Sequence, residues 1–170
     1  MSLLPEWAPS IHPMIVHFPI ALLFAAGVAD LVSVAPGRLS WLRRTTVALY
    51  AAGAVAALIA MRSGQVAAGA LQLPPAAQAI LHDHEEWGER TVWYFGILAL
   101  VRLVAMWRDH QVRLPLRAVL LALGLGGLLL VLETGEHGAQ LVFQQGVGVR
   151  AQSGSAASPS STATSARPAP

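Results

Sequence analysis

The sequence contains no cysteine and no lysine, and charged residues make up only 12% of its 170 residues. Without cysteine the chain can form no disulfide, no thiolate metal site and no covalent c-type haem linkage. A soluble domain averages about a quarter charged residues, whereas 55% of the residues here are hydrophobic. Because lipid-facing surface cannot carry charge, the composition predicts an integral membrane protein. The net charge of +2 comes with no long basic run, which argues against a nucleic-acid partner.

Four apolar stretches are long enough to cross a lipid bilayer. They lie at about residues 13–35, 45–62, 90–108 and 116–134. A helix of about 20 residues crosses the hydrocarbon core of about 30 Å. A signal peptide is the alternative for the first stretch, but no basic residue precedes it, so we expect a retained helix. The sequence therefore predicts an all-α fold, a four-helix transmembrane bundle over residues 11–149.

The arginines predict the orientation of this bundle. Two short turns between spans hold most of them: Arg38, Arg43 and Arg44 in the first, and Arg108, Arg113 and Arg117 around the second. Short loops rich in arginine stay in the cytoplasm. We therefore expect both chain ends and the long middle loop to face outward, which also places seven of the nine acidic residues outside.

Two segments outside the spans have clear signals of their own. In the middle loop, Pro74-Pro75 followed by Ala-Ala-Gln-Ala predicts a helix that starts at Pro75, continues into the third span and projects about three turns above the membrane. After Gln152 the composition shifts to Ser, Ala, Thr and Pro without aromatics. Residues 152–170 are therefore predicted to form a disordered tail.

The histidines are the first candidates for chemistry. Five of the six lie on the predicted outer side: His12, His17, His82, His84 and His137. Histidine in or beside a span is costly unless it pairs or binds a ligand. Pro19 removes a backbone hydrogen bond and should kink the helix near His17. On a helix His84 and Gly88 share a face, and the missing side chain leaves flat space beside the imidazole, as a porphyrin needs. Solvated polar residues above the membrane are the alternative.

Asp30 and Arg102 are the charges deepest in the membrane. Asp30 lies six residues before Pro36, and Arg102 lies six residues before Arg108, so their predicted depths match. An unpaired charge at that depth is expensive, so we expect a structural ion pair between them. A proton relay is the alternative, but no second acidic residue lies in the predicted inner half of the spans.

Three motifs resemble those of the bacterial membrane proteins grouped as domain of unknown function 2231. They are His-Pro-Met-Ile-Val-His-Phe-Pro-Ile at residues 12–20, His-x-x-x-Gly at 84–88, and Gly-Ala-Gln-Leu-Val-Phe-Gln-Gln-Gly-Val-Gly-Val at 138–149. The resemblance covers about residues 11–149 and implies a multi-pass protein of the bacterial cytoplasmic membrane. The family often has a histidine before the last Gly-Val-Gly-Val, where this chain has Gln145; His137 is the nearest substitute. Similar domains occur beside cytochrome domains, which implies a cytochrome or other redox partner at the outer face.

Three functions remain open from the sequence. The leading functional hypothesis is a b-type haem protein that transfers electrons at the outer face, with His17 and His84 as iron ligands, His12 as the substitute for His17, and Gly88 beside the haem. The second is an outer-face copper or zinc site, for which the candidate ligands are His12, Met14, His82, His84, Glu85 and His137. The third is a non-catalytic membrane subunit or anchor without a cofactor. No hydrolytic motif is present, so an enzyme is expected less than any of these.

Overall fold

The computed structural model describes residues 10–33, 40–71, 73–108 and 114–149, which form five helices and no strand. The helices are α1 (His12–Ile15), α2 (His17–Ser33), α3 (Ser40–Gly69), α4 (Pro75–Arg108) and α5 (Leu114–Phe143). The predicted disordered tail lies outside the described residues.

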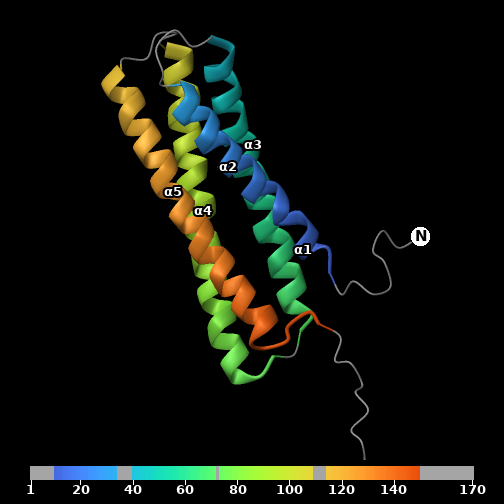
Figure 1. The fold of residues 1–170 in the computed structure, drawn as a ribbon. Coiled ribbons are helices and arrows are strands. Elements are labelled where there is room, and N and C mark those ends of the chain that lie inside the picture. Colours follow the sequence, from blue (N-terminus) through green and yellow to red (C-terminus); the bar gives the residue numbers. More distant parts are fainter. Residues whose placement is uncertain (1–9, 34–39, 72, 109–113, 150–170) are drawn as a thin grey trace, which may run out of the picture.

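The four long helices form one antiparallel bundle (Figure 1). Each helix packs against the next along the chain, and α2 also packs against α5, while the short α1 packs on α3 and α2. One end of the bundle, which we call the histidine end, contains His12 and His84. The opposite end, which we call the arginine end, contains Arg44, Arg108 and Arg117. Both α1 and the last turn of α5 lie at the histidine end, so the described chain begins and ends on the same side.

The surface of the bundle suits lipid. All four long helices are long and apolar enough to span a membrane, counting α1 and α2 as one. Large apolar side chains point outward on every one of them; Val28, Ile97 and Leu129 are each about 60% exposed. In water such a surface would be an aggregation hazard, whereas in a bilayer it is the expected exterior. The predicted class, an all-α four-helix transmembrane bundle, is confirmed.

Three helices continue past the predicted spans at the histidine end. The helix predicted to start at Pro75 and run into the third span is confirmed, because α4 is continuous from Pro75 to Arg108. The sequence did not predict that α3 and α5 also continue, to Gly69 and Phe143. With 34 residues, α4 is about 51 Å long, well over the roughly 30 Å of hydrocarbon. Residues 63–69, 75–89 and 135–143 thus form a helical head beyond the predicted spans.

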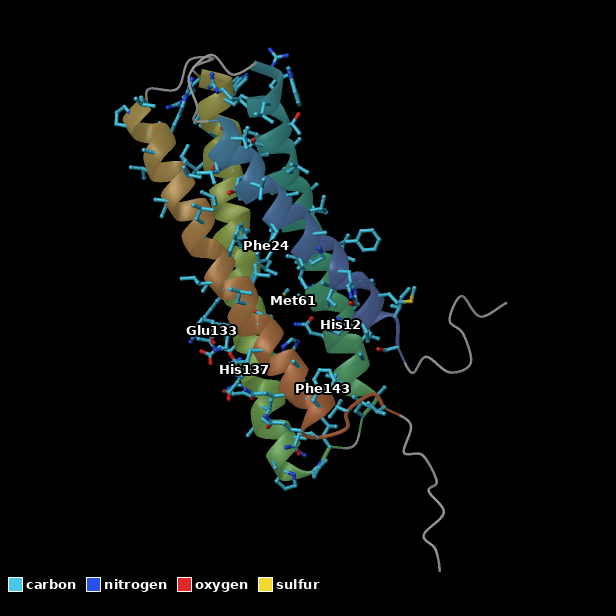
Figure 2. All side chains as sticks on the ribbon, in the orientation of Figure 1. His12, Phe24, Met61, Glu133, His137 and Phe143 are labelled. Atoms are coloured by element: carbon cyan, nitrogen blue, oxygen red, sulfur yellow. The ribbon has the colours of Figure 1, made fainter. Side chains whose placement is uncertain are left out.

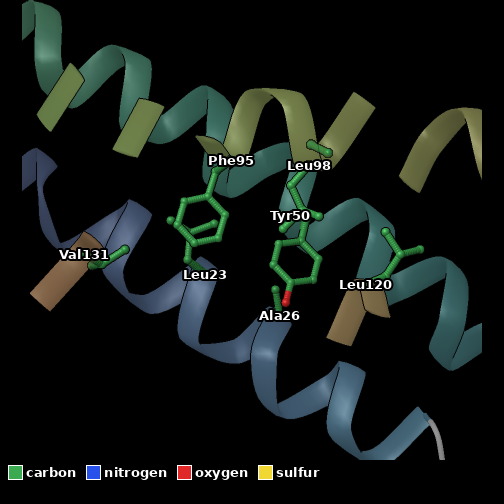
Figure 3. Packing of buried hydrophobic residues seen from close by; sticks show 8 residues of the cluster. Leu23, Ala26, Tyr50, Phe95, Leu98, Leu120 and Val131 are labelled. Carbon is green, nitrogen blue, oxygen red and sulfur yellow. The ribbon is translucent and has the colours of Figure 1, made fainter. Parts of the chain in front are cut away.

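The core holds the four helices together at mid-bundle (Figure 3). Leu23, Tyr50 and Phe95 are fully buried there, and the ring of Tyr50 stacks on Phe95 with centroids 6.2 Å apart. At Gly127 of α5, an added Cβ would lie 2.5 Å from Cε1 of Tyr94, so only glycine allows this approach of α4 to α5.

The first span is interrupted at Val16, between α1 and α2. Pro19 has no N–H to donate to the carbonyl of Ile15, and the next bond, from Ile20 N to Val16 O, is stretched to 3.4 Å. This is the distortion expected near His17. The interruption is local, because Val16 keeps helical backbone angles and its N–H still bonds to the carbonyl of His12. The packing of α1 on α3 brings His12 to that helix.

Candidate cofactor site

Two histidines from distant parts of the sequence meet at the histidine end. The imidazoles of His12 on α1 and His84 on α4 have their ring centroids 6.3 Å apart, with the ring planes at 79°. Both side chains are partly buried. Figure 2 shows His12 among the side chains at this end of the bundle. The two rings come from opposite sides of the bundle, since α1 leads into α2, and α2 packs against α3 and α5 rather than against α4.

The ring of His12 is held by α3. Its Nδ1 lies 2.9 Å from Oγ of Ser63. The hydroxyl of Ser63 donates to the carbonyl of Ala60 at 2.8 Å, so its oxygen accepts the Nδ1–H of His12. The next residue, Gly64, gives the ring room, because an added Cβ there would lie 3.0 Å from Cε1 of His12. This pattern leaves Nε2 of His12 unprotonated, with its lone pair free.

The ring of His84 is held by α5 in the same manner. Its Nδ1 lies 2.9 Å from the backbone oxygen of Thr134, and since a carbonyl only accepts, Nδ1 carries the hydrogen. An added Cβ at Gly138 would lie 3.1 Å from Cε1 of His84. The hydroxyl of Thr134 lies 3.0 Å from that of Thr91 on α4, which ties the two helices together beside the ring. Nε2 of His84 therefore also keeps its lone pair.

The two settings together match those of metal-binding histidines. A histidine that ligates a metal through one nitrogen almost always donates its other N–H to a carbonyl, carboxylate or water, which fixes the tautomer and the ring orientation. Two imidazoles on opposite sides of one metal, with N–metal bonds of about 2.0 Å, have ring centres on the order of 6 Å apart. The separation of 6.3 Å between His12 and His84 agrees with that distance.

The other residues selected from the sequence lie apart from this pair. His17 is exposed at the start of α2, and His12, its substitute, takes the place beside His84. Gly88 borders α5 rather than the imidazole, because its added Cβ would meet only Cγ2 of Thr134, at 3.8 Å. The space beside His84 comes from Gly138 instead.

The two alternate histidines are also outside the pair. His82 is exposed on α4. His137 makes its contacts elsewhere. Its Nδ1 lies 2.9 Å from the carbonyl oxygen of Glu133 on its own helix. Its ring stacks on Trp87 of α4, with the ring centroids 6.5 Å apart. Across the described residues, no group of three or more His, Asp or Glu side chains is arranged to hold a metal ion. The pair thus offers two protein ligands.

A second polar group lies buried toward the arginine end. Arg102 of α4 forms an ion pair with Asp30 of α2, the partner expected from their matched depths. The same guanidinium donates to the carbonyl of Leu120 on α5 and lies over the ring of Tyr50 on α3, with Cζ 4.2 Å from the centroid. Asp30 and Arg102 are each about 95% buried, so the pair links all four long helices inside the bundle.

A family model described as "Predicted membrane protein (DUF2231)" matches residues 8–151. The chain belongs to this family. The match covers all the residues that the structure describes, and confirms the resemblance of the three motifs. No curated protein and no solved structure matches the chain.

In this DUF2231 protein, sequence reasoning missed the residues that hold the two rings. They are Ser63, Gly64, Thr134 and Gly138. The signals available were weak: a serine and a glycine follow the last apolar turn of one span, and a threonine and a glycine follow the acidic end of another. Hydroxyl and glycine residues at such positions are as common in helix ends and loops as beside a ligand. Only the packing of α1 on α3 and of α4 on α5 gives them their role.

Proposed function

We propose that this membrane protein binds a b-type haem between His12 and His84 and transfers electrons at the histidine end. The proposal rests on one observation: two imidazoles from opposite sides of the bundle, 6.3 Å apart, each with its Nδ1–H donated to a neighbouring helix. Four-helix bundles commonly build cofactor sites from side chains on facing helices. When bound, the haem supplies one-electron redox chemistry at iron, which no side chain of this chain provides.

The number of protein ligands favours haem over copper or zinc. Structural zinc sites use four protein ligands and catalytic ones about three, whereas the described residues contain no group of three or more His, Asp or Glu side chains arranged to hold a metal ion. His12 and His84 would supply the two protein ligands with which a haem can be held. The absence of cysteine excludes covalent, c-type attachment, so the haem would be bound without a covalent link, as haem b is.

The residues beside the two rings fit this role. Gly64 and Gly138 remove side-chain bulk next to each imidazole, where an added Cβ would lie 3.0 Å and 3.1 Å from the ring. The Nδ1–H bonds hold both rings in one tautomer and raise the basicity of Nε2 as a ligand. Ser63 and the Thr134 carbonyl therefore act as positioning groups for His12 and His84.

The location of the pair supports exchange of electrons outside the bilayer. His84 lies in the helical head, nine residues before Trp93, which is about 13 Å along the helix. Tryptophan is enriched at membrane interfaces. The arginine-rich turns at the other end are predicted to face the cytoplasm, so the pair would face outward from a bacterial cytoplasmic membrane. A soluble or membrane-bound redox protein at that face is the expected partner.

Absorption spectroscopy tests the proposal. The protein is expressed with haem supplied, purified in mild detergent, and examined for a Soret band, with the pyridine haemochrome assay for haem b and metal analysis for copper and zinc. We expect a low-spin, six-coordinate spectrum that is lost in His12→Ala and in His84→Ala. His17→Ala is the matched control, since it removes an exposed histidine of the same segment, and should keep the native spectrum.

Three outcomes would contradict the proposal in different ways. A preparation without a Soret band and without metal would favour the alternative of a subunit or anchor that has no cofactor. Stoichiometric copper or zinc without haem would favour the second hypothesis. A spectrum lost in His17→Ala but kept in His12→Ala would move the ligand from α1 to α2.

A further inference from the structure

The exposed carboxylates of the described chain lie at the histidine end, on two neighbouring helices. They are Asp83, Glu85, Glu86 and Glu89 on α4, and Glu133 and Glu136 on α5. We call these six residues, with the side chains between them, the acidic surface. In Figure 2, Glu133 and His137 lie on one side of the histidine end and His12 on the other. On the side of His12, α1 and residues 63–69 of α3 contain no Asp, Glu or Arg.

The carboxylates of the acidic surface repel one another and have few counter-charges. Three pairs are three or four residues apart along a helix: Asp83 with Glu86, Glu85 with Glu89, and Glu133 with Glu136. Like charges at these spacings destabilise a helix. Of the six residues, only Glu86 forms an ion pair within the described chain, with Arg90. The protein therefore carries uncompensated negative charge at this place, at a cost to its own stability.

Contact with water does not account for this arrangement. The helical head includes the end of α3 as well as parts of α4 and α5, yet α3 presents there Val66, which is 78% exposed. Charges that served only to keep the head in water would be expected on all of its helices, with both signs mixed. A field of one sign on one side of a protein instead attracts molecules of the opposite charge.

A stacked pair of rings lies between the carboxylates. The ring of Trp87 on α4 stacks on His137 of α5, and Cζ of Arg90 lies 4.7 Å from the centroid of the Trp87 ring. Tryptophan and arginine are enriched among the few residues that dominate the binding energy of protein interfaces. Trp87 follows His84 by three residues, and His137 precedes Gly138, which lies against the ring of His84. The acidic surface thus adjoins one of the two proposed iron ligands.

We propose that the acidic surface is the docking site of a soluble protein whose own face is basic, rich in Lys or Arg. Opposite charges on two proteins speed their encounter and orient them, even where binding is weak. Complexes that transfer electrons are commonly of this weak kind, with small interfaces. That the partner exchanges electrons with the His12–His84 site rests on the proposed function, whereas the basic character of its face rests on the charges of the acidic surface.

Removal of two carboxylates tests the docking site. The probe is a dye-labelled soluble c-type cytochrome with a lysine-rich face, and the protein is held in nanodiscs of phosphatidylcholine, which has no net charge. We expect Glu133→Gln/Glu136→Gln to raise the Kd of the probe about fivefold, because each exposed charge contributes modestly. Gln65→Lys/Val66→Lys is the matched control, because it changes the net charge by the same amount at exposed positions of α3. At about 0.1 M salt, charges more than about 10 Å away are screened, so the control should change Kd by less than about twofold.

Binding of the probe should depend on the position of the charges and not only on their number. Equal Kd values for the two double variants would overturn the proposal. So would equally tight binding of a probe whose lysines are acetylated, or binding of calcium without binding of the probe, which would mean a cation site. Glu133→Gln/Glu136→Gln should unfold at no lower temperature than the native protein, because it removes a pair of like charges. Glu85→Gln/Glu89→Gln tests the same surface from α4 and should raise Kd by a similar factor.

The docking site and the haem site can fail separately in this experiment. A preparation without a Soret band, in which Kd responds to the variants as expected, would support the docking site and contradict the haem proposal. A preparation with a Soret band, in which Kd is the same for the native protein and for Glu133→Gln/Glu136→Gln, would support the haem proposal and overturn the docking site.

Discussion

Gly138 of α5 lies so close to the imidazole of His84 on α4 that a Cβ at the glycine would be 3.1 Å from Cε1 of the ring. A contact of this length is tighter than nine in ten contacts of real Cβ atoms, so the ring must shift by a few tenths of an ångström if the glycine gains a side chain. Gly64 stands in the same relation to His12, at 3.0 Å. The two glycines therefore determine where the two imidazoles can lie.

Gly138→Ala should displace His84 and weaken haem binding. We expect the dissociation constant from a haem titration to rise about tenfold or more, the effect typical of a disturbed ligand setting. Gly135→Ala is the control on the same helix, because an added Cβ there meets nothing within 4 Å. Alanine favours helix over glycine by about 1 kcal/mol, so this control should be slightly more stable and bind haem as the native protein does. Equal binding by both variants would mean that the ring of His84 does not depend on Gly138.

Thr91→Val should loosen the attachment of α4 to α5 beside His84. The hydroxyl of Thr91 is buried, lies 3.0 Å from that of Thr134, and donates to the carbonyl of Trp87. Valine keeps the shape and removes the bond, so we expect a loss of about 1 kcal/mol in the free energy of unfolding. Thr45→Val is the control: its hydroxyl is exposed and bonds only to Trp41 of its own helix. Denaturation in detergent measures both, and a loss no larger in Thr91→Val than in Thr45→Val would contradict the role of the contact.

Asp30→Ala should destabilise the bundle strongly, because it leaves the guanidinium of Arg102 buried without its counter-charge. Breaking one side of a buried pair costs about 3–5 kcal/mol, whereas replacing both partners by apolar residues costs much less. The double variant Asp30→Leu/Arg102→Leu should therefore be more stable than Asp30→Ala. The exposed pair of Arg90 and Glu86 is the control, and Glu86→Gln should change the free energy of unfolding by under about 0.5 kcal/mol.

Function distinguishes the two roles of this ion pair. Asp30→Asn keeps the shape of the side chain and removes its charge. If the pair is structural, the variant loses stability, and the protein that remains folded keeps the proposed electron-transfer activity. A variant that folds as well as the native protein but has no electron-transfer activity would support the proton relay instead.

The bundle and its ion pair could be predicted from the sequence for simple reasons. Hydrophobic length predicts a span without any knowledge of its neighbours. The pairing of Asp30 with Arg102 followed from counting residues to the chain turns, which works because α2 and α4 run toward the same end. The continuation of α3 to Gly69 and α5 to Phe143 was missed, because apolar length marks only the part inside lipid.

The choice between His12 and His17 could not be made from the sequence. Five residues apart on a helix, two side chains point about 140° away from each other, so only one can face the bundle. Which one does so depends on the packing of α1 against α3, a contact between residues far apart in the sequence. The contacts of His84 with Thr134 and Gly138 join residues far apart in the sequence, and no local spacing reports them.

Ser63→Ala should affect His12 alone, because the two rings are held by different kinds of acceptor. His84 donates to a backbone carbonyl, which no substitution removes, whereas His12 donates to the hydroxyl of Ser63. Loss of a hydrogen-bond partner of this kind lowers metal affinity about 10–100-fold. We therefore expect the haem dissociation constant of Ser63→Ala to be about 10–100 times that of the native protein. At a fixed total concentration of haem, the fraction of haem with a low-spin spectrum should fall as the affinity falls.

Ser33→Ala is the control for a serine lost from a helix, since its hydroxyl bonds only to the carbonyl of Asp30. The free energy of unfolding of both variants is measured without haem. A variant that has lost stability in this measurement has a changed fold, whereas one that has lost only haem affinity has a changed site. If Ser63→Ala binds haem as tightly as Ser33→Ala at equal stability, His12 does not depend on its Nδ1 bond, and this bond does not prepare Nε2 as a ligand. If Ser63→Ala binds more weakly while Ser33→Ala does not, the Nδ1 bond to Ser63 positions His12 as a ligand.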